Sequence, residues 1–154
     1  MGRAQSRFVE HASWLLRLPL ETPTIPFEDE RSGCTLWLKL DYLLPSGCTK
    51  DRMATNIVAH AIASGEVSPS TVVVEASSGS TSIALSMVCA TVGVPFRAYM
   101  PKTVSGERVL MIRRLGGDVL RVRDHVTECR LTEGRRGAGE VRRDLADHLV
   151  RQRR

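Results

Sequence analysis

Residues 71–92 read Thr-Val-Val-Val-Glu-Ala-Ser-Ser-Gly-Ser-Thr-Ser-Ile-Ala-Leu-Ser-Met-Val-Cys-Ala-Thr-Val, and this stretch decides the fold. The β-branched run at residues 71–75 is typical of a short strand buried in a parallel sheet. The apolar residues 83–92, followed by Gly93, predict a buried helix with a glycine stop. A turn of small residues, 76–81, joins the two. The stretch is therefore a strand–turn–helix unit, the repeating unit of α/β folds.

The turn itself suggests a binding role. A strand followed by a tight turn and a helix start directs free backbone N–H groups toward an anion. Serine and threonine hydroxyls add donors, and Gly79 lets the backbone come close to a ligand. Many units of this kind use the same turn merely to cap the helix, however, and the residues alone leave both interpretations open.

Upstream, residues 45–52 read Pro-Ser-Gly-Cys-Thr-Lys-Asp-Arg. Thr49 is the expected N-cap of a helix that ends at residues 64–65, so Lys50 falls in the first helical turn. The positive end of the helix dipole disfavours a cation there and favours the neutral, nucleophilic amine. The alternative is an ordinary exposed lysine beside Asp51. An apolar stripe at helical spacing follows: Met53, Ala54, Ile57, Val58, Ala61 and Ile62.

The remaining elements complete an alternating pattern. Residues 6–18 predict a helix that stops before Pro19, residues 21–26 an extended segment with two prolines, and residues 35–40 a first strand that includes Lys39. Further elements are a strand at 95–101, a helix capped by Thr103 or Ser105 and running to Leu115, and a strand at 118–122. The pattern predicts an α/β fold with a parallel sheet of about four strands and flanking helices.

Composition limits the class of protein. The 154 residues are 42% hydrophobic and 25% charged, which is ordinary for one modest globular domain. The four cysteines lie far apart without a Cys-x-x-Cys pair, so we expect a reduced, cytoplasmic protein with neither disulfides nor a metal site. No apolar run approaches membrane-spanning length. Residues 125–154 carry eight arginines against five acids but no aromatic residue, which makes a nucleic-acid-binding module a weak alternative.

Several of these stretches resemble one enzyme family. Residues 45–52 are similar to the Pro-x-Gly-Ser-x-Lys-Asp-Arg motif of the pyridoxal-phosphate-dependent cysteine synthase and cystathionine β-synthase family, with Cys48 in place of serine. Residues 75–85 resemble the family's Glu-x-Thr-Ser-Gly-Asn-Thr-Gly-Ile-Ala-Leu loop, with Ser80 in place of asparagine. Residues 100–108 resemble its Met-Pro-x-x-x-Ser-x-Glu-Arg segment, which we expect to position the sheet and to carry no chemistry.

The resemblance implies a cofactor, a substrate class and site residues. It implies pyridoxal 5'-phosphate bound covalently by Lys50, which then serves as the base at the substrate Cα, with Ser80 next to the cofactor ring. Ser77, Ser78, Gly79 and Thr81 would bind the substrate carboxylate. The implied reaction is β-replacement or β-elimination on cysteine or an O-activated serine. The Ser-Ser-Gly-Ser-Thr version of the loop is similar to that of cysteine-desulfhydrase-like members.

The resemblance covers residues 22–124 and implies the N-terminal domain of the tryptophan-synthase-β-like fold. Family members are about twice as long, and their second half supplies a glycine-rich phosphate cradle. We therefore expect a truncated form, divided into an N-terminal helix and extended segment (1–34), an α/β domain (35–124) and an Arg-rich helical tail (125–154). The alternative function is a non-catalytic remnant, or a partial domain that needs a partner chain. A homo-oligomer is also possible.

Overall fold

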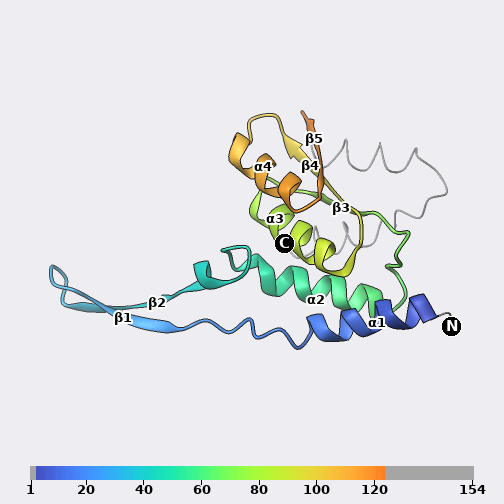
Figure 1. Ribbon diagram of the computed structural model, residues 1–154. Helices are drawn as coiled ribbons and strands as arrows, with labels where there is room; N and C mark the ends of the chain where they lie inside the picture. The colour runs from blue at the N-terminus through green and yellow to red at the C-terminus, as the bar shows by residue number, and fades with distance from the viewer. Residues whose placement is uncertain (1–2, 124–154) are drawn as a thin grey trace.

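The computed structural model describes residues 3–123 and consists of a helix–sheet body with a projecting hairpin (Figure 1). In chain order the elements are α1 (Arg3–Leu15), β1 (Thr24–Asp29), β2 (Cys34–Lys39), the 3-10 helix η1 (Asp41–Leu43), α2 (Lys50–Ala63), β3 (Val73–Ala76), α3 (Ser80–Val92), β4 (Phe96–Pro101), α4 (Gly106–Arg114) and β5 (Asp118–Val122). The α/β class, with a parallel sheet and flanking helices, is confirmed.

The parallel sheet has the order β3-β4-β5, and its two faces are covered differently. Val73 pairs with Phe96, and Ala98 pairs with Val119, so the strands run in register from one βαβ unit to the next. Alternate side chains point to opposite faces of a strand. Phe96 and Ala98 accordingly join the main core with the helices, while Tyr99 belongs to a smaller apolar cluster on the other face.

Helix α3 lies at the centre of the main core, in contact with α1, α2, α4 and the sheet. Nine of its thirteen residues are buried, because the helix has neighbours on most of its sides. Leu85 and Cys89 are completely buried, and burial raises the pKa of the Cys89 thiol to about 12. The stripe expected on α2 faces this helix in part: Val58 and Ile62 are buried, while Met53 is only partly covered.

The expected helix ends agree with the structure to within a few residues. Ser64 is the C-cap of α2, Gly93 ends α3 in the left-handed conformation, and Ser105 is the N-cap of α4. The first helix is displaced from the expected range 6–18: α1 ends at Leu15 and the chain continues in a turn. The helical tail expected at residues 125–154 lies outside the described residues.

One expected strand belongs to a different sheet. Residues 35–40 were expected to begin the parallel sheet, but β2 pairs antiparallel with β1, with Thr24 opposite Lys39 and Asp29 opposite Cys34. The parallel sheet therefore has three strands in the described part of the chain instead of about four. The connection explains the difference. A short link allows only a hairpin, since a parallel crossover needs a dozen residues or more.

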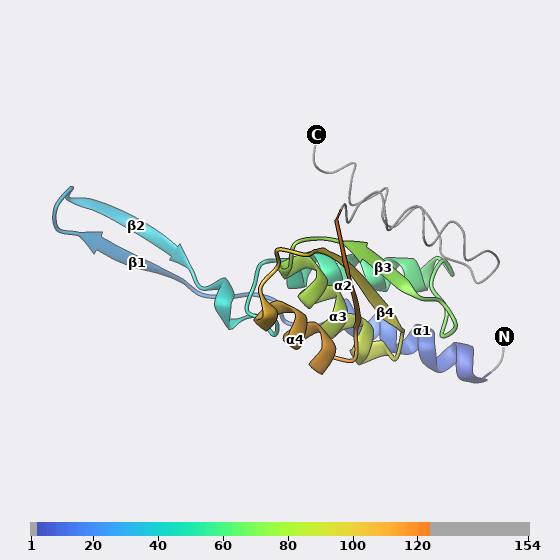
Figure 2. The same cartoon turned by 90° about the horizontal axis from the view of Figure 1, so that it is seen from above.

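The hairpin stands apart from the core. Both views show β1 and β2 extending away from the helix–sheet body (Figures 1 and 2), and the boundary expected after residue 34 falls at the first residue of β2. Its large apolar side chains are exposed: Ile25, Phe27, Leu36, Trp37 and Leu38.

Among the described helices, none has both the length and the apolar composition to cross a membrane.

Candidate active site

Two turns meet at the candidate site. The lysine turn (residues 46–50) precedes α2, and the serine loop (residues 77–81) precedes α3. The helices α2 and α3 pack against each other, and their starts lie close together. The Cys48 thiol donates a weak hydrogen bond to the Ser80 carbonyl, with an S···O distance of 3.8 Å. The structure thus brings together two segments that lie about thirty residues apart in the sequence.

A buried aspartate shapes the lysine turn. Asp51 is completely buried, and its carboxylate accepts hydrogen bonds from the Ser46 N–H, at 2.7 Å, and from the Ser46 hydroxyl. Gly47 adopts a positive φ of 78° within the turn, which favours glycine. Buried carboxylates are stable only when hydrogen-bonded in this way. Asp51 therefore fixes the backbone conformation of the turn that carries the adjacent residue Lys50.

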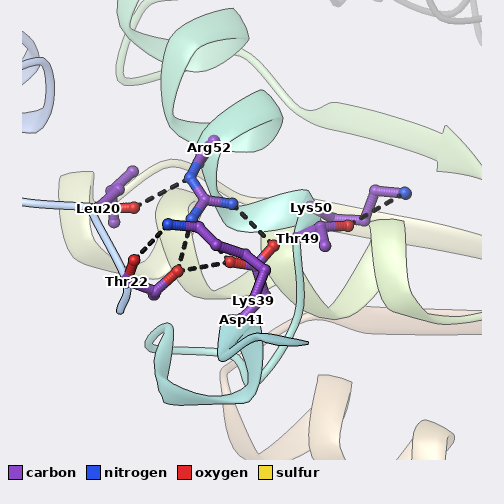
Figure 3. A network of polar contacts seen from close by, with 7 residues as sticks. All are labelled: Leu20, Thr22, Lys39, Asp41, Thr49, Lys50 and Arg52. Atoms are coloured by element: carbon purple, nitrogen blue, oxygen red, sulfur yellow. Dashed lines mark hydrogen bonds and ion pairs between the residues drawn. The ribbon is translucent and has the colours of Figure 1, made fainter. Parts of the chain in front are cut away.

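Lys50 itself lies at the first position of α2, as expected. Thr49 occupies the N-cap position, but its side chain makes no capping hydrogen bond. The threonine hydroxyl instead accepts a long hydrogen bond from the Lys50 amine, at 3.4 Å. In Figure 3 the Lys50 side chain points away from the Arg52 side chain. Because the hydrogen bond to Thr49 is long, the Lys50 amine remains available for a reaction partner.

Arg52 anchors α2 to the base of the hairpin (Figure 3). The guanidinium donates to both carboxylate oxygens of Asp41, at 2.8 and 3.0 Å, and to the Leu20 carbonyl at 2.9 Å. It also donates to the Thr22 hydroxyl at 3.1 Å, which in turn donates to Asp41 at 2.7 Å. Such a two-pronged arginine–carboxylate pair is among the stronger polar contacts in proteins. We call these four residues the arginine clamp.

The clamp was not identified from the sequence. The signal was present in the Asp-Arg ending of the motif at residues 45–52, but the partners Asp41 and Thr22 lie outside it. Lys39 was expected to be only a strand residue. It is the last residue of β2, and its amine donates to the Thr22 carbonyl, so it also supports the clamp.

The serine loop turns sharply at Gly79, whose φ of 154° and ψ of −78° are rarely adopted by residues with a side chain. The Ser77 hydroxyl is buried and accepts hydrogen bonds from the N–H groups of Gly79 and Ser82, at 3.4 and 3.3 Å. It also exchanges a 2.6 Å hydrogen bond with the Ser82 hydroxyl. The Ser77 side chain therefore holds the loop together from inside.

Donors remain free at the start of α3. Within residues 3–123, the N–H groups of Ser78, Ser80 and Thr81 donate to no acceptor. The side chains of Ser78 and Ser80 are exposed, while Thr81 is buried. Unpaired N–H groups at a helix start, together with the positive end of its dipole, favour an anion such as a carboxylate. The assignment of Ser77, Ser78, Gly79 and Thr81 to a substrate carboxylate stays a prediction.

A further residue reaches the serine loop. Arg108, in the first turn of α4, donates from Nη1 to the Ser78 carbonyl at 2.8 Å. A methyl group on Gly79 would lie 2.6 Å from Cδ of Arg108, so the arginine lies directly over this glycine. We expected residues 100–108 to position the sheet only. The position of Arg108 shows that this segment also contacts the candidate site.

The described residues include no cluster of histidine, cysteine, aspartate or glutamate suited to a metal ion. Cys34, Cys48 and Cys89 are free thiols, and the fourth cysteine lies outside the described range. What the two turns do offer is the primary amine of Lys50 at the start of one helix and free N–H donors at the start of the next. A primary amine of this kind suits a carbonyl compound, and the donors suit an anion.

The arginine clamp predicts a specific pH dependence of stability. Hydrogen bonds from Arg52 and Thr22 hold the pKa of Asp41 at about 2, below its ordinary value of 3.8. The unfolded chain therefore binds a proton more readily than the folded chain, so the contribution of Asp41 is complete above about pH 4 and is lost as the pH falls toward 2. Urea unfolding should show Asp41→Asn less stable than wild type at pH 6, with a gap that narrows steadily at acidic pH. A gap independent of pH would contradict this role.

Comparison with known proteins identifies the family. The profile described as "Pyridoxal-phosphate dependent enzyme" matches residues 16–151, and so extends beyond residue 124, where the expected resemblance ended. Cysteine synthase B of Escherichia coli (strain K12) is 34% identical over 116 residues, which cover 75% of this chain and 36% of that protein. The chain thus spans about a third of the length of this relative.

Solved structures agree with the sequence comparison. A cysteine synthase from Entamoeba histolytica matches with a TM-score of 0.72 at 27% identity, over 81% of this chain and 40% of that one. A hydrogen sulfide-producing enzyme from Fusobacterium nucleatum matches with a TM-score of 0.70 at 29% identity, over 80% and 43%. The expected resemblance to cysteine synthases, and to the N-terminal part of their fold, is confirmed. The chain belongs to the family of pyridoxal-phosphate dependent enzymes.

Proposed function

We propose that this chain carries the lysine-bearing domain of an enzyme of β-replacement or β-elimination, acting on cysteine or an O-activated serine. The supporting observation is the meeting of the lysine turn and the serine loop, where the Cys48 thiol contacts the Ser80 carbonyl. The relatives support the substrate class, because their names include cysteine synthases and an O-ureido-L-serine synthase.

The donors present fit part of pyridoxal 5'-phosphate. The Lys50 amine suits the aldehyde, and the exposed Ser80 hydroxyl suits a polar substituent of the ring. When bound, the cofactor supplies an electron sink for chemistry at Cα and Cβ of an amino acid. The described residues include no comparable set of donors that we assign to the phosphate, which needs several aimed N–H groups.

The residues of this chain then have distinct roles. Free N–H groups at the start of α3 would bind the substrate carboxylate and so fix the orientation of its Cα–H bond. The Lys50 amine, held at the start of α2 by the Asp51-fixed turn, would take the proton from Cα, after which the leaving group departs from Cβ. Synthase and desulfhydrase activities share this step and diverge only after it.

The exposed apolar side chains of the hairpin support a second proposal. A domain of this kind would require a partner chain, or a second copy, to complete the cofactor site. The hairpin supports this, since Trp37 is 69% exposed and Phe27 is 53% exposed. Exposed apolar side chains gathered on one element are typical of interaction surfaces.

Covalent labelling tests the role of Lys50. Borohydride reduction of the chain with pyridoxal 5'-phosphate, followed by peptide mapping, should place the label on Lys50. Lys39 is held by the Thr22 carbonyl, and Lys102 follows β4, outside the lysine turn and the serine loop, so we expect neither to compete with Lys50 for the cofactor. The variant Lys50→Ala should lose the label, whereas the control Lys102→Ala should retain it. Label on Lys39 or Lys102 with Lys50 unmodified would refute the assignment.

The role of Ser80 is tested by restoring the family's asparagine. If Ser80 contacts the cofactor ring, Ser80→Asn should leave the fold intact and strengthen cofactor binding several-fold, since one hydrogen bond contributes roughly 1 kcal/mol net. Fluorescence titration with pyridoxal 5'-phosphate measures the change, and Ser78→Asn is a matched control on the same exposed loop. Equal affinity in wild type and Ser80→Asn would mean that Ser80 only begins the helix.

Turnover decides between the two proposals. We expect the pure 154-residue chain, with cofactor in excess, to release little sulfide from cysteine and to form little cysteine from O-acetylserine, because the phosphate would be loosely held. Light scattering should reveal self-association that falls when Trp37 is replaced by serine. Robust turnover by the monomeric chain would refute the need for a partner.

A further inference from the structure

Arg108 is an exposed residue whose side chain contacts the serine loop. Its Nη1 atom donates to the Ser78 carbonyl at 2.8 Å. The aliphatic part of the side chain covers the α-carbon of Gly79, where a methyl group would lie 2.6 Å from Cδ, 3.0 Å from Nη1 and 3.1 Å from Nε. A methyl group at this position would force the Arg108 side chain to shift, so the observed contact depends on the absence of a side chain at Gly79.

The helix that carries Arg108 is held firmly against α3. The Ser86 hydroxyl of α3 donates to the Ile112 carbonyl of α4 at 3.2 Å, and Ile112 is completely buried. At Gly117, just beyond α4, a methyl group would lie 2.7 Å from the Ser86 hydroxyl oxygen and 2.8 Å from Ile112. Packing this close leaves little freedom for α4 to slide. Arg108 therefore reaches the loop from a fixed base.

The contact orients one peptide group. In a trans peptide the carbonyl and the N–H of the next residue point in opposite directions. Arg108 binds the Ser78 carbonyl on one side, and the Gly79 N–H on the other side donates to the Ser77 hydroxyl at 3.4 Å. The peptide between Ser78 and Gly79 is thus held from both ends. This leaves the N–H groups of Ser80 and Thr81 free at the start of α3.

We propose that Arg108 is a positioning residue for substrate carboxylate binding: its guanidinium fixes the Ser78–Gly79 peptide, so that the free N–H groups of the serine loop are preorganised. The proposal rests on the proposed function, because it assumes that this loop receives the carboxylate of an amino acid. The planar fork of arginine suits the task, since it can donate to a carbonyl while its stem packs on glycine. A lysine at position 108 would keep the positive charge but would lack the planar guanidinium group.

The test uses the full chain and three variants. Arg108→Ala removes the contact and Arg108→Lys keeps only the charge. The control Arg113→Ala removes an equal charge from an exposed position in the last turn of the same helix. Circular dichroism first confirms that each variant folds. NMR order parameters then report the rigidity of the amides of residues 78–81 without any ligand. Amide shifts of Ser80 and Thr81 report binding of L-serine in the presence of pyridoxal 5'-phosphate.

The expected pattern is specific. In Arg108→Ala the order parameters of residues 78–80 should fall from about 0.85 to below about 0.6, and L-serine should bind about tenfold more weakly, the effect of losing a hydrogen bond to a charged group. Arg108→Lys should recover only part of the affinity, and Arg113→Ala should match wild type. Labelling of Lys50 by the cofactor should be unchanged in all three variants.

Each other result has a definite meaning. Unchanged order parameters in Arg108→Ala would overturn the positioning role. Full recovery of L-serine binding in Arg108→Lys would also overturn it, because the positive charge alone would then account for the binding. Failure of wild type to link the cofactor to Lys50 would instead overturn the proposed function. In that event the order parameters still decide whether Arg108 holds the loop, so the two failures are distinguishable.

Discussion

The burial of α3 between α2 and the parallel sheet is the constraint on which the rest of the structure depends. A helix that carries apolar residues on most of its sides is stable in water only when those sides are covered. α2 and α4 cover it laterally and β4 covers it from the sheet. α2 packs alongside α3, and the contact between the Cys48 thiol and the Ser80 carbonyl shows that both helices begin at the same end of the body. The packing of the core therefore brings the lysine turn next to the serine loop, where Cys48 contacts Ser80.

Local patterns in the sequence were sufficient for the helices and for the strands of the parallel sheet. The strand β5, Asp118–Val122, and the glycine stop at Gly93 coincide with the elements expected. The partner of β2 could not be predicted from periodicity, because a strand pattern does not specify the sheet that the strand joins. The Arg52–Asp41 and Arg108–Ser78 contacts also escaped prediction, since each joins residues that become neighbours only after the chain has folded.

Two arginines near helix starts, Arg52 and Arg108, have similar structural roles. Arg52 lies in the first turn of α2 and Arg108 in the first turn of α4, where the helix dipole disfavours a cation. Both turn their guanidinium groups toward backbone carbonyls of another segment, Leu20 for one and Ser78 for the other. These contacts, with the Asp41 carboxylate in the first case, offset the unfavourable position. Each arginine thereby attaches a helix start to a neighbouring loop of the chain.

The arginine clamp also stabilises the base of the hairpin. A two-stranded hairpin without a core is marginal in water, and the side chains of β1 and β2 are almost all exposed. The order of its base must therefore come from polar contacts, of which Arg52–Asp41 and Lys39–Thr22 are the principal ones. Arg52 is two residues from Lys50 on the same helical turn. The clamp therefore joins the base of the hairpin to the helical turn that carries the lysine.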